Sequence, residues 1–417
     1  MIAIETIFLV TLALIAYACI GYPALVFILS RFFERPVRRL DVTPTVSVII
    51  AAYNEERDIA RKIENTLLLD YPSEKVEIIV ASDSSTDNTD RIVRGYSHLS
   101  VKLHRQQQRL GKTMAQNSAV QISSGDVLVF TDATTRYRCD ALRNIVRPFA
   151  DPEVGCVSSQ LVYLDDVNTS VGRGCRSYWG YENLLRESES RLGSMIGVTG
   201  CLYAVRRTSY TDLAHDMCSD FVIASEIHLK GLRTIDEPEA ISIEDTNSKS
   251  RDEFRMRVRI MEQTINALSR YREVLSIRRH GLFALQMISH KVLRYAVSGL
   301  LLVSFISNAL IANQSELYLA AFAGQTAFYL SAFVGWILTR LGARIGLLAL
   351  PYYFVLSNAA ILVAFVKHIR GEAHIVWDPL RETNKSASGV ATARAGTRRD
   401  SRCWLTFCRR RLNRESN

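Results

Sequence analysis

Acidic side chains stand at the ends of three apolar runs in the first third of the sequence. Glu55, Asp83 and Asp132 each follow or close such a run, and short polar segments surround them. A carboxylate at the carboxyl end of a buried strand is well placed to hold a metal ion or a sugar hydroxyl. A single acid at a strand end is commonly explained by turn capping. Three of them in one unit favour a nucleotide-type site.

The elements that position these acids alternate between strands and helices. β-Branched runs predict buried strands, and amphipathic segments between them predict helices. This alternation is typical of a doubly wound, mainly parallel α/β sheet, in which the acids after the first, second and fourth strands share one edge. The predicted strands are residues 46–52, 76–80, 101–104 and 126–132, and two of the predicted helices are residues 59–69 and 112–122.

Long apolar runs lie on both sides of this α/β region. Each is close to the ~20 residues that cross a bilayer, and residues 2–30 carry one charge, Glu5. No Lys or Arg precedes the first run, which argues against a removable signal peptide. We therefore expect an N-terminal transmembrane helix in residues 1–31 and a C-terminal transmembrane region in residues 291–370. The three C-terminal runs are residues 292–312, 317–338 and 345–366.

The net charge of +9 is unevenly distributed. Arg31, Arg35, Arg38 and Arg39 follow the first apolar run, so the positive-inside tendency predicts a multi-pass protein of the cell membrane with a cytoplasmic middle domain. Basic residues beside membrane spans are common, and we expect no nucleic-acid partner. The eight cysteines form no C-x-x-C pair, which indicates neither a zinc site nor a disulfide framework.

Several motifs in series resemble those of membrane-bound family 2 glycosyltransferases. They are residues 46–55, 83–87, 111–117, 131–132, 200–207, 219–221 and 255–260, which together cover about residues 46–294. The chain is similar to exopolysaccharide, poly-N-acetylglucosamine and hyaluronan/cellulose synthase-type enzymes. The resemblance implies a GT-A domain over residues 45–245 and inverting transfer from a nucleotide sugar, usually a UDP-sugar, to a lipid or glycan acceptor.

The resemblance also implies roles for individual residues of the donor site. Asp132 would hold a divalent metal, Mg²⁺ or Mn²⁺, on the donor diphosphate. The second acid of the family's usual Asp-x-Asp is replaced by Thr134. Glu55 can instead favour a helix dipole, and Lys112 can be a solvated helix-start residue. The donor-site residues are Tyr53, Glu55, Asp83, Lys112, Thr131 and Asp132.

The family's catalytic base falls on Asp220, which would accept the proton of the acceptor hydroxyl. Ser219 stands where the family usually has a further acid. The alternative for Asp220 is a cap on the helix that runs through Glu226.

Arg257 and Arg259 match the two arginines of the Q-Q/R-x-R-W motif of processive relatives, and would stabilise charge on the leaving diphosphate. The motif's Gln and Trp are missing, which leaves processive synthesis open. Residues 246–290 are expected to form basic, amphipathic interfacial helices. A stripe of Phe254, Met261 and Ile265 either faces lipid or packs on protein.

Two further expectations concern the C-terminal part and the function class. A flexible basic tail is predicted for residues 382–417, and Pro351 makes the last apolar run either a span or an interfacial element. Aromatic residues 178–182 fit core packing or sugar stacking. The alternatives to a simple transferase are a processive polysaccharide synthase, a nucleotidyltransferase, a transporter with a sensing domain, and a catalytically impaired sugar-nucleotide-binding scaffold.

Overall fold

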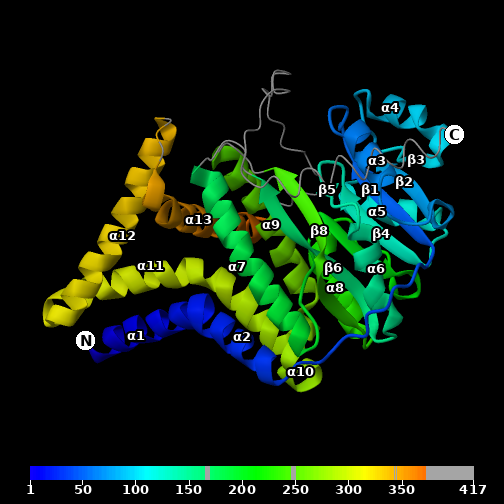
Figure 1. The fold of residues 1–417 in the computed structure, drawn as a ribbon. Coiled ribbons are helices and arrows are strands. Elements are labelled where there is room, and N and C mark those ends of the chain that lie inside the picture. Colours follow the sequence, from blue (N-terminus) through cyan, green and yellow to red (C-terminus); the bar gives the residue numbers. More distant parts are fainter. Residues whose placement is uncertain (165–169, 246–249, 342, 344, 372–417) are drawn as a thin grey trace, which may run out of the picture.

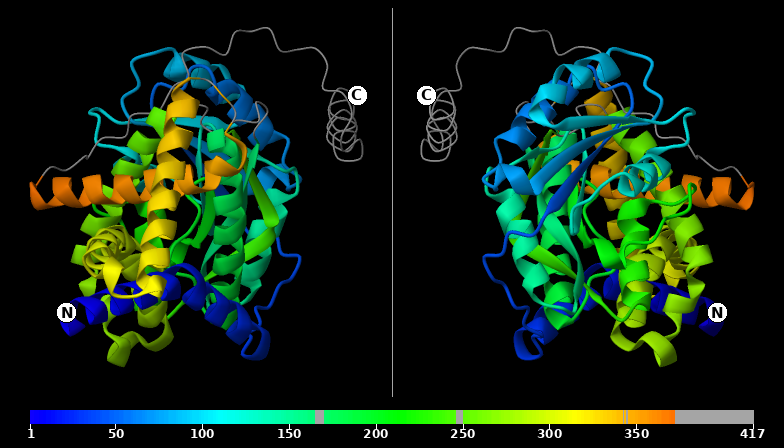
Figure 2. Two further views of the ribbon diagram at one scale, coloured as in Figure 1. Left: turned by 90° about the vertical axis from the view of Figure 1, so that its left-hand side faces the viewer. Right: turned by 90° about the vertical axis from the view of Figure 1, so that its right-hand side faces the viewer.

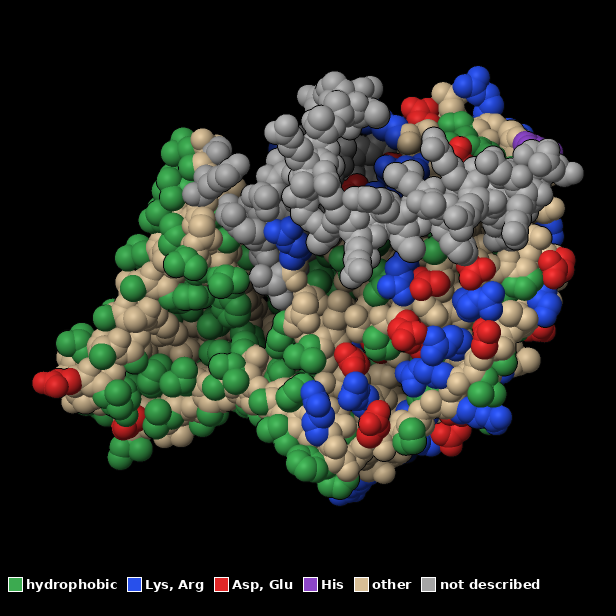
Figure 3. Space-filling view, in the orientation of Figure 1, with side chains coloured by type: hydrophobic (Ala, Val, Ile, Leu, Met, Phe, Trp, Pro, Cys, Tyr) green, Lys and Arg blue, Asp and Glu red, His purple; other side chains and the backbone are tan. Residues whose placement is uncertain are grey.

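Two regions with different surfaces make up the computed structural model, which describes residues 1–164, 170–245, 250–341, 343 and 345–371. An α/β region carries one sheet, and long helices extend from it on the other side (Figure 1). Charged side chains cover the α/β region, whereas apolar side chains cover the long helices (Figure 3). The predicted tail, residues 382–417, lies outside the described residues.

The described strands form one eight-stranded sheet with the order β3-β2-β1-β4-β7-β6-β8-β5. Its first four strands are mutually parallel, as predicted. β7 runs antiparallel to β4 and to β6, so the whole sheet is mixed. The strands are β1 Val46–Ala52, β2 Val76–Ser82, β3 Val101–Arg105, β4 Val127–Asp132, β5 Arg136–Tyr137, β6 Val154–Leu164, β7 Leu202–Arg206 and β8 Arg233–Asp245.

Helices cover both faces of the sheet because its central strands are apolar on both sides. Val48 and Ile50 of β1 pack under α3, whereas Ile49 packs on the opposite face with α5 and α8. The helices of this region are α3 Ile59–Leu67, α4 Thr89–Gly95, α5 Lys112–Gln121, α6 Ala141–Val146, α7 Ser170–Leu192 and α8 Ser219–Leu229. Short 3-10 turns are η2 Ser73–Lys75, η3 Ser97–Leu99, η4 Arg147–Ala150 and η5 Arg207–Ser209.

Four helical segments of the described chain are long and apolar enough to cross a membrane: Ile2–Phe32, Ile277–Gln314, Glu316–Arg340 and Gly346–Ile369. α1 and α11 lie side by side along their lengths (Figure 1). The helices are α1 Ile2–Ala16, α2 Tyr22–Phe32, α9 Ser250–Arg270, α10 Ile277–Gln286, α11 Arg294–Ile311, α12 Glu316–Arg340 and α13 Ala349–Ile369. Shorter turns are η1 Tyr17–Gly21, η6 Arg272–Leu275, η7 Met287–Leu293, η8 Ala312–Gln314 and η9 Gly346–Leu348, of which η1 and η7 are π-helical.

The last apolar helix, α13, takes a different direction from the others. It crosses α11 and α12 steeply instead of running beside them (Figures 1 and 2). The stripe of Phe254, Met261 and Ile265 on α9 packs against Ala360 and Ile361 of α13. The stripe is therefore an intramolecular packing surface and not a lipid-facing one, which corrects the lipid-facing alternative.

Candidate active site

One cavity of about 1580 Å³ extends from the carboxyl ends of β1 and β4 to the membrane-type helices. Strand ends, the start of α8, α9 and α13 all contribute to its wall, as expected for ligand sites outside the carboxyl ends of an α/β sheet. Six of the predicted site residues line it: Glu55, Lys112, Asp132, Asp220, Arg257 and Arg259. The structure thus brings two of the three predicted donor acids, Glu55 and Asp132, into one space with the predicted base and the predicted phosphate arginines.

Asp132, the last residue of β4, forms an ion pair with Lys112 at the start of α5. Gly111 precedes Lys112 with φ of 93°, a left-handed conformation that glycine adopts without strain. Burial opposes the charged form of Lys112, but the carboxylates of Asp132 and Asp220 outweigh burial and raise its pKa. Lys112 is therefore a fixed cation inside the cavity and not a solvated helix-start lysine.

A second carboxylate beside Asp132 comes from Glu244, which is not among the residues predicted from the sequence. Glu244 lies near the end of β8 and lines the cavity. Its carboxylate accepts a hydrogen bond from Thr135 Oγ1 at 2.7 Å, and Thr134 Oγ1 lies 3.4 Å away. Burial and the neighbouring charge of Asp132 raise the pKa of Glu244. Its only sequence signal is its place at the end of a strand whose neighbours are distant in the chain.

The oxygen donors at this point fit a hard divalent cation that also binds a substrate phosphate. Mg²⁺ is commonly held by one or two carboxylates together with phosphate oxygens and water. Asp132 and Glu244 provide two such carboxylates, with the Thr134 hydroxyl nearby. Within the described residues no group of three or more acidic, His or Cys side chains forms a complete metal cage. The donor set therefore fits a metal that is completed by the substrate.

Three predicted donor-site residues do not line the cavity. Asp83 accepts hydrogen bonds from the backbone N–H groups of Leu110 and Gly111, both at 2.9 Å, and so holds the loop before α5. The Tyr53 ring lies 3.8 Å from the guanidinium carbon of Arg109. Thr131 is fully buried, and its hydroxyl donates to the Cys201 carbonyl at 2.7 Å. Their positions are those of supports around the site.

Lys62 of α3 holds the turn that follows Asp132 by bonding to residues on both sides of it. It is 1% exposed, and its ammonium donates to Thr131 Oγ1 at 2.8 Å and to the Thr135 carbonyl at 2.7 Å. The ammonium also lies 3.5 Å from the centre of the Tyr137 ring. Burial lowers the pKa of Lys62, while the charge of Asp132 opposes that shift. The β4–β5 turn is thereby held to α3.

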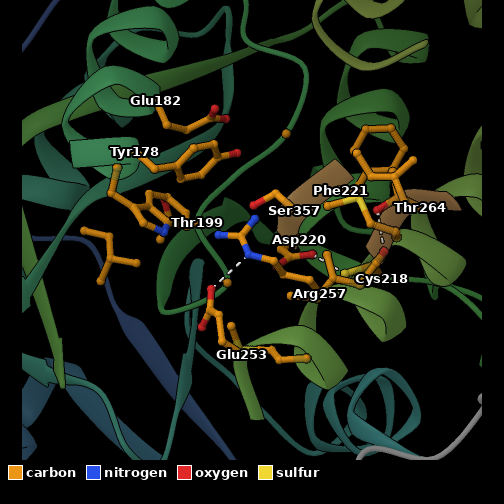
Figure 4. A pocket seen from close by; sticks show the side chains of 18 of the residues that line it. Tyr178, Glu182, Thr199, Cys218, Asp220, Phe221, Glu253, Arg257, Thr264 and Ser357 are labelled. Atoms are coloured by element: carbon orange, nitrogen blue, oxygen red, sulfur yellow. Dashed lines mark hydrogen bonds and ion pairs between the residues drawn. The ribbon is translucent and has the colours of Figure 1, made fainter. Parts of the chain in front are cut away.

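Asp220 occupies the second position of α8, and its carboxylate faces the cavity (Figure 4). The N-cap of α8 is Cys218, whose Sγ donates to Asp220 Oδ1 at 2.6 Å. A Cβ atom added at Gly200 would lie 2.5 Å from Asp220 Oδ2. Any residue other than glycine at position 200 would therefore displace this carboxylate. The predicted alternative, in which Asp220 caps the helix, is not the role seen here.

Arg257 extends into the cavity from α9 (Figure 4). Its guanidinium pairs with Glu253 one turn earlier at 2.9 Å and donates to the hydroxyl of Tyr353 on α13. Arg259 lines the same space, whereas Arg255 is exposed and lies outside it. Of the three arginines at positions 255, 257 and 259 of α9, the two that match the family motif are thus the two that line the cavity.

The aromatic residues of α7 combine the two roles considered from sequence. Tyr178 and Trp179 pack with Tyr353 around the η9–α13 region, and both also line the cavity. Both side chains therefore pack on protein and also present a surface to the cavity, where a ligand could contact them.

The family model described as Glycosyl transferase family 2 matches residues 47–213. The beta-monoglucosyldiacylglycerol synthase of Nostoc sp. is 26% identical over 186 residues, 44% of this chain and 39% of that protein. The poly-beta-1,6-N-acetyl-D-glucosamine synthase of Staphylococcus aureus is 26% identical over 218 residues, 50% of this chain and 52% of that protein. The match thus spans about half or less of the length of these curated relatives.

Among solved structures, a mannosyltransferase from Pyrobaculum calidifontis, determined with GDP-Man and Mn²⁺, superposes with a TM-score of 0.68. The match covers 88% of this chain and 99% of the other, at 24% identity. At this identity the likeness concerns the fold, and it confirms the predicted GT-A architecture.

Proposed function

We propose that this chain, whose residues 47–213 match the Glycosyl transferase family 2 model, is a glycosyltransferase that moves a sugar from a nucleotide-sugar donor to a lipid-linked or polysaccharide acceptor at the membrane. The donor is a UDP-sugar, and transfer inverts the anomeric centre. One observation carries the proposal: a single cavity holds the Asp132–Lys112 pair, the Asp220 carboxylate and the Arg257 guanidinium. Polysaccharide synthesis is the broad process that this activity serves.

The donor diphosphate would lie against the strand ends, where carboxylates and cations are both present. Asp132 and Glu244 would hold a divalent metal, which supplies positive charge to the departing nucleoside diphosphate when bound. Lys112 and the guanidinium groups of Arg257 and Arg259 add fixed cations on the same wall. Because these groups are held by packing and ion pairs, they need little reorganisation as charge develops.

Asp220 would act as the general base. Its carboxylate accepts the proton of an acceptor hydroxyl while that oxygen bonds to the anomeric carbon and the bond to the diphosphate breaks. The Cys218 thiol and the gap at Gly200 hold the carboxylate in one position. Ser219 is buried at the same turn, so the base operates without the second acid found in relatives.

The apolar helices and the basic segment after α2 support a place in the cell membrane with the catalytic domain in the cytoplasm. Arg31 lies in the last turn of α2, and Arg35, Arg38 and Arg39 follow the helix. A cytoplasmic cavity that continues between membrane-type helices would let a soluble donor meet a membrane-bound acceptor.

Incubating membranes that contain the protein with a panel of radiolabelled nucleotide sugars tests this function. We expect label from one donor to enter a lipid or polymer fraction, and Asp132→Ala to lower that transfer at least ~100-fold because a main carboxylate of the diphosphate site is lost. Asp126→Ala, an exposed acid at the opposite end of the same strand region, is the matched control and should keep full transfer. Transfer that survives Asp132→Ala with the same metal dependence would refute the site, and no turnover of any donor would favour the impaired scaffold.

A further inference from the structure

The cavity changes its chemistry as it leaves the donor site. Around Asp132 its wall is acidic and polar, whereas its far part is lined by apolar side chains of three membrane-type helices. Leu12 and Ile15 come from α1, Phe328 from α12, and Leu350 from α13. These helices expose apolar surface over most of their length (Figure 3). A ligand that fills the cavity therefore needs a polar end near Asp220 and an apolar end among these helices.

Cationic side chains line the boundary between the polar and the apolar parts. Arg186 comes from α7, Lys291 from η7 and Arg294 from the start of α11. Two carboxylates, Glu182 and Glu189, lie among them. Arg294 Nη1 donates to Glu182 at 2.9 Å, and His290 lies between the two acids, with Nε2 3.3 Å from Glu182 and Nδ1 2.9 Å from Glu189. Positive charge thus exceeds negative charge at this boundary.

Lys291 is the cation of this group that forms no direct salt bridge among the described residues, although Glu182 and Glu189 lie near enough to act on its charge. Salt bridges with Glu182 are made by Arg186, His290 and Arg294, and none is made by Lys291. Its ammonium lies 5.8 Å from the centre of the Phe221 ring, the residue that follows the proposed base. An ammonium in the wall of the cavity that also holds the proposed base is suited to an anionic group of the acceptor.

We infer that the acceptor is a sugar linked through phosphate to a lipid chain, an inference that rests on the proposed function. The lipid chain lies among α1, α12 and α13, and the phosphate binds Lys291 with Arg294 beside it. The sugar then extends toward Asp220. A neutral glycan would leave Lys291 without an anion in direct contact, and a soluble sugar phosphate would leave the apolar part of the cavity unfilled.

The reaction balances without any further reactant. A hydroxyl oxygen of the acceptor sugar bonds to the donor's anomeric carbon, and the bond from that carbon to the nucleoside diphosphate breaks. The hydroxyl proton passes to the Asp220 carboxylate. The lipid phosphate takes no part in bond making and remains in the product, so its role is recognition.

Binding to the purified protein in neutral-lipid nanodiscs tests the inference with three probes: farnesyl diphosphate, farnesol and inorganic diphosphate. We expect farnesyl diphosphate to bind at least ~10-fold more tightly than either fragment, because only it carries both groups. Lys291→Met should weaken its binding ~10-fold or more, as expected for loss of a charge-assisted contact, and Lys291→Arg should restore most of it. Arg279→Met, an exposed cation of α10 outside the cavity, should change nothing.

UDP binding separates this inference from the proposed function. UDP and farnesyl diphosphate should bind together, and Lys291→Met should leave the UDP dissociation constant unchanged. Displacement of farnesyl diphosphate by UDP would place its phosphates in the donor site and overturn the inference, as would equal binding of inorganic diphosphate or of farnesol. If the wild-type protein failed to bind UDP, the proposed function would fail while the three lipid-probe results would still decide the inference.

Discussion

Gly200→Ala should slow transfer strongly without unfolding the protein. The added Cβ would lie 2.5 Å from Asp220 Oδ2, closer than real Cβ contacts occur, and 3.3 Å from its Cγ, which is a tight contact. To restore an ordinary contact of 3.4 Å, the carboxylate must retreat by about 0.9 Å. The obstacle is the end of one side chain and not backbone, so the cost in stability is about 0.5–1.5 kcal/mol, that of an off-rotamer side chain.

The cost to catalysis should be much larger than the cost to stability. A displacement of about 1 Å at a reacting group can lower a rate ~100-fold, which corresponds to ~2.7 kcal/mol in the barrier. We therefore expect Gly200→Ala to lower kcat about 100-fold while the donor KM and the melting temperature change little. The assay is initial-rate transfer of labelled sugar by the reconstituted protein, with donor affinity measured separately by calorimetry.

Gly197→Ala is the matched control on the same connection. Its added Cβ meets Phe221 Cδ2 at 3.6 Å and the Asp220 carbonyl oxygen at 3.8 Å, which are ordinary van der Waals contacts. Its kcat should stay within about twofold of the wild-type value. Wild-type turnover in Gly200→Ala would show that the position of the Asp220 carboxylate does not limit the reaction.

Two further predictions concern stability. Burial raises the pKa of Asp236 to about 7 from 3.8, so the folded state holds this proton more tightly than the unfolded chain, and stability falls as pH rises from about 4 to 7. The melting temperature of Asp236→Asn should therefore be higher than that of the wild-type protein at pH 8 and nearly the same at pH 4. If the melting temperatures of both proteins fell equally with rising pH, the raised pKa of Asp236 would be contradicted. Val258→Asp places a charge between α9 and α13, where Val258 is 7% exposed, and should destabilise the detergent-solubilised protein by about 3 kcal/mol or more. The exposed Arg255→Ala on the same helix should not, and equal melting of the two variants would mean that this face of α9 does not pack on α13.

Sequence patterns predicted those parts of the fold that are determined by residues close together in the chain. The β-branched run of residues 46–52 coincides with β1, and the strand-end acids Asp132 and Glu55 reach the cavity as expected. Thr131 precedes Asp132 in β4, and successive side chains of a strand point to opposite faces. That alternation alone indicates that only one of the two can face the site.

The features that the sequence did not predict depend on contacts between distant segments. Glu244 reaches the turn after Asp132 because β8 pairs with β5, Arg136 opposite Ile243, across about 100 residues of chain, and no local pattern records that pairing. The apolar stripe of α9 predicts a buried face, but its partner, α13, lies about 100 residues later. Periodicity therefore indicates that a face is covered, and only the tertiary structure identifies what covers it.

The most direct test of the account compares donor binding with transfer in Asp220→Asn. The amide matches the carboxylate in shape but cannot take the acceptor proton, so kcat should fall ~100-fold or more while the dissociation constant for the nucleotide sugar stays within about twofold. If Asp220→Asn weakens donor binding as much as it slows transfer, Asp220 is a donor ligand, and the assignment of the base is wrong.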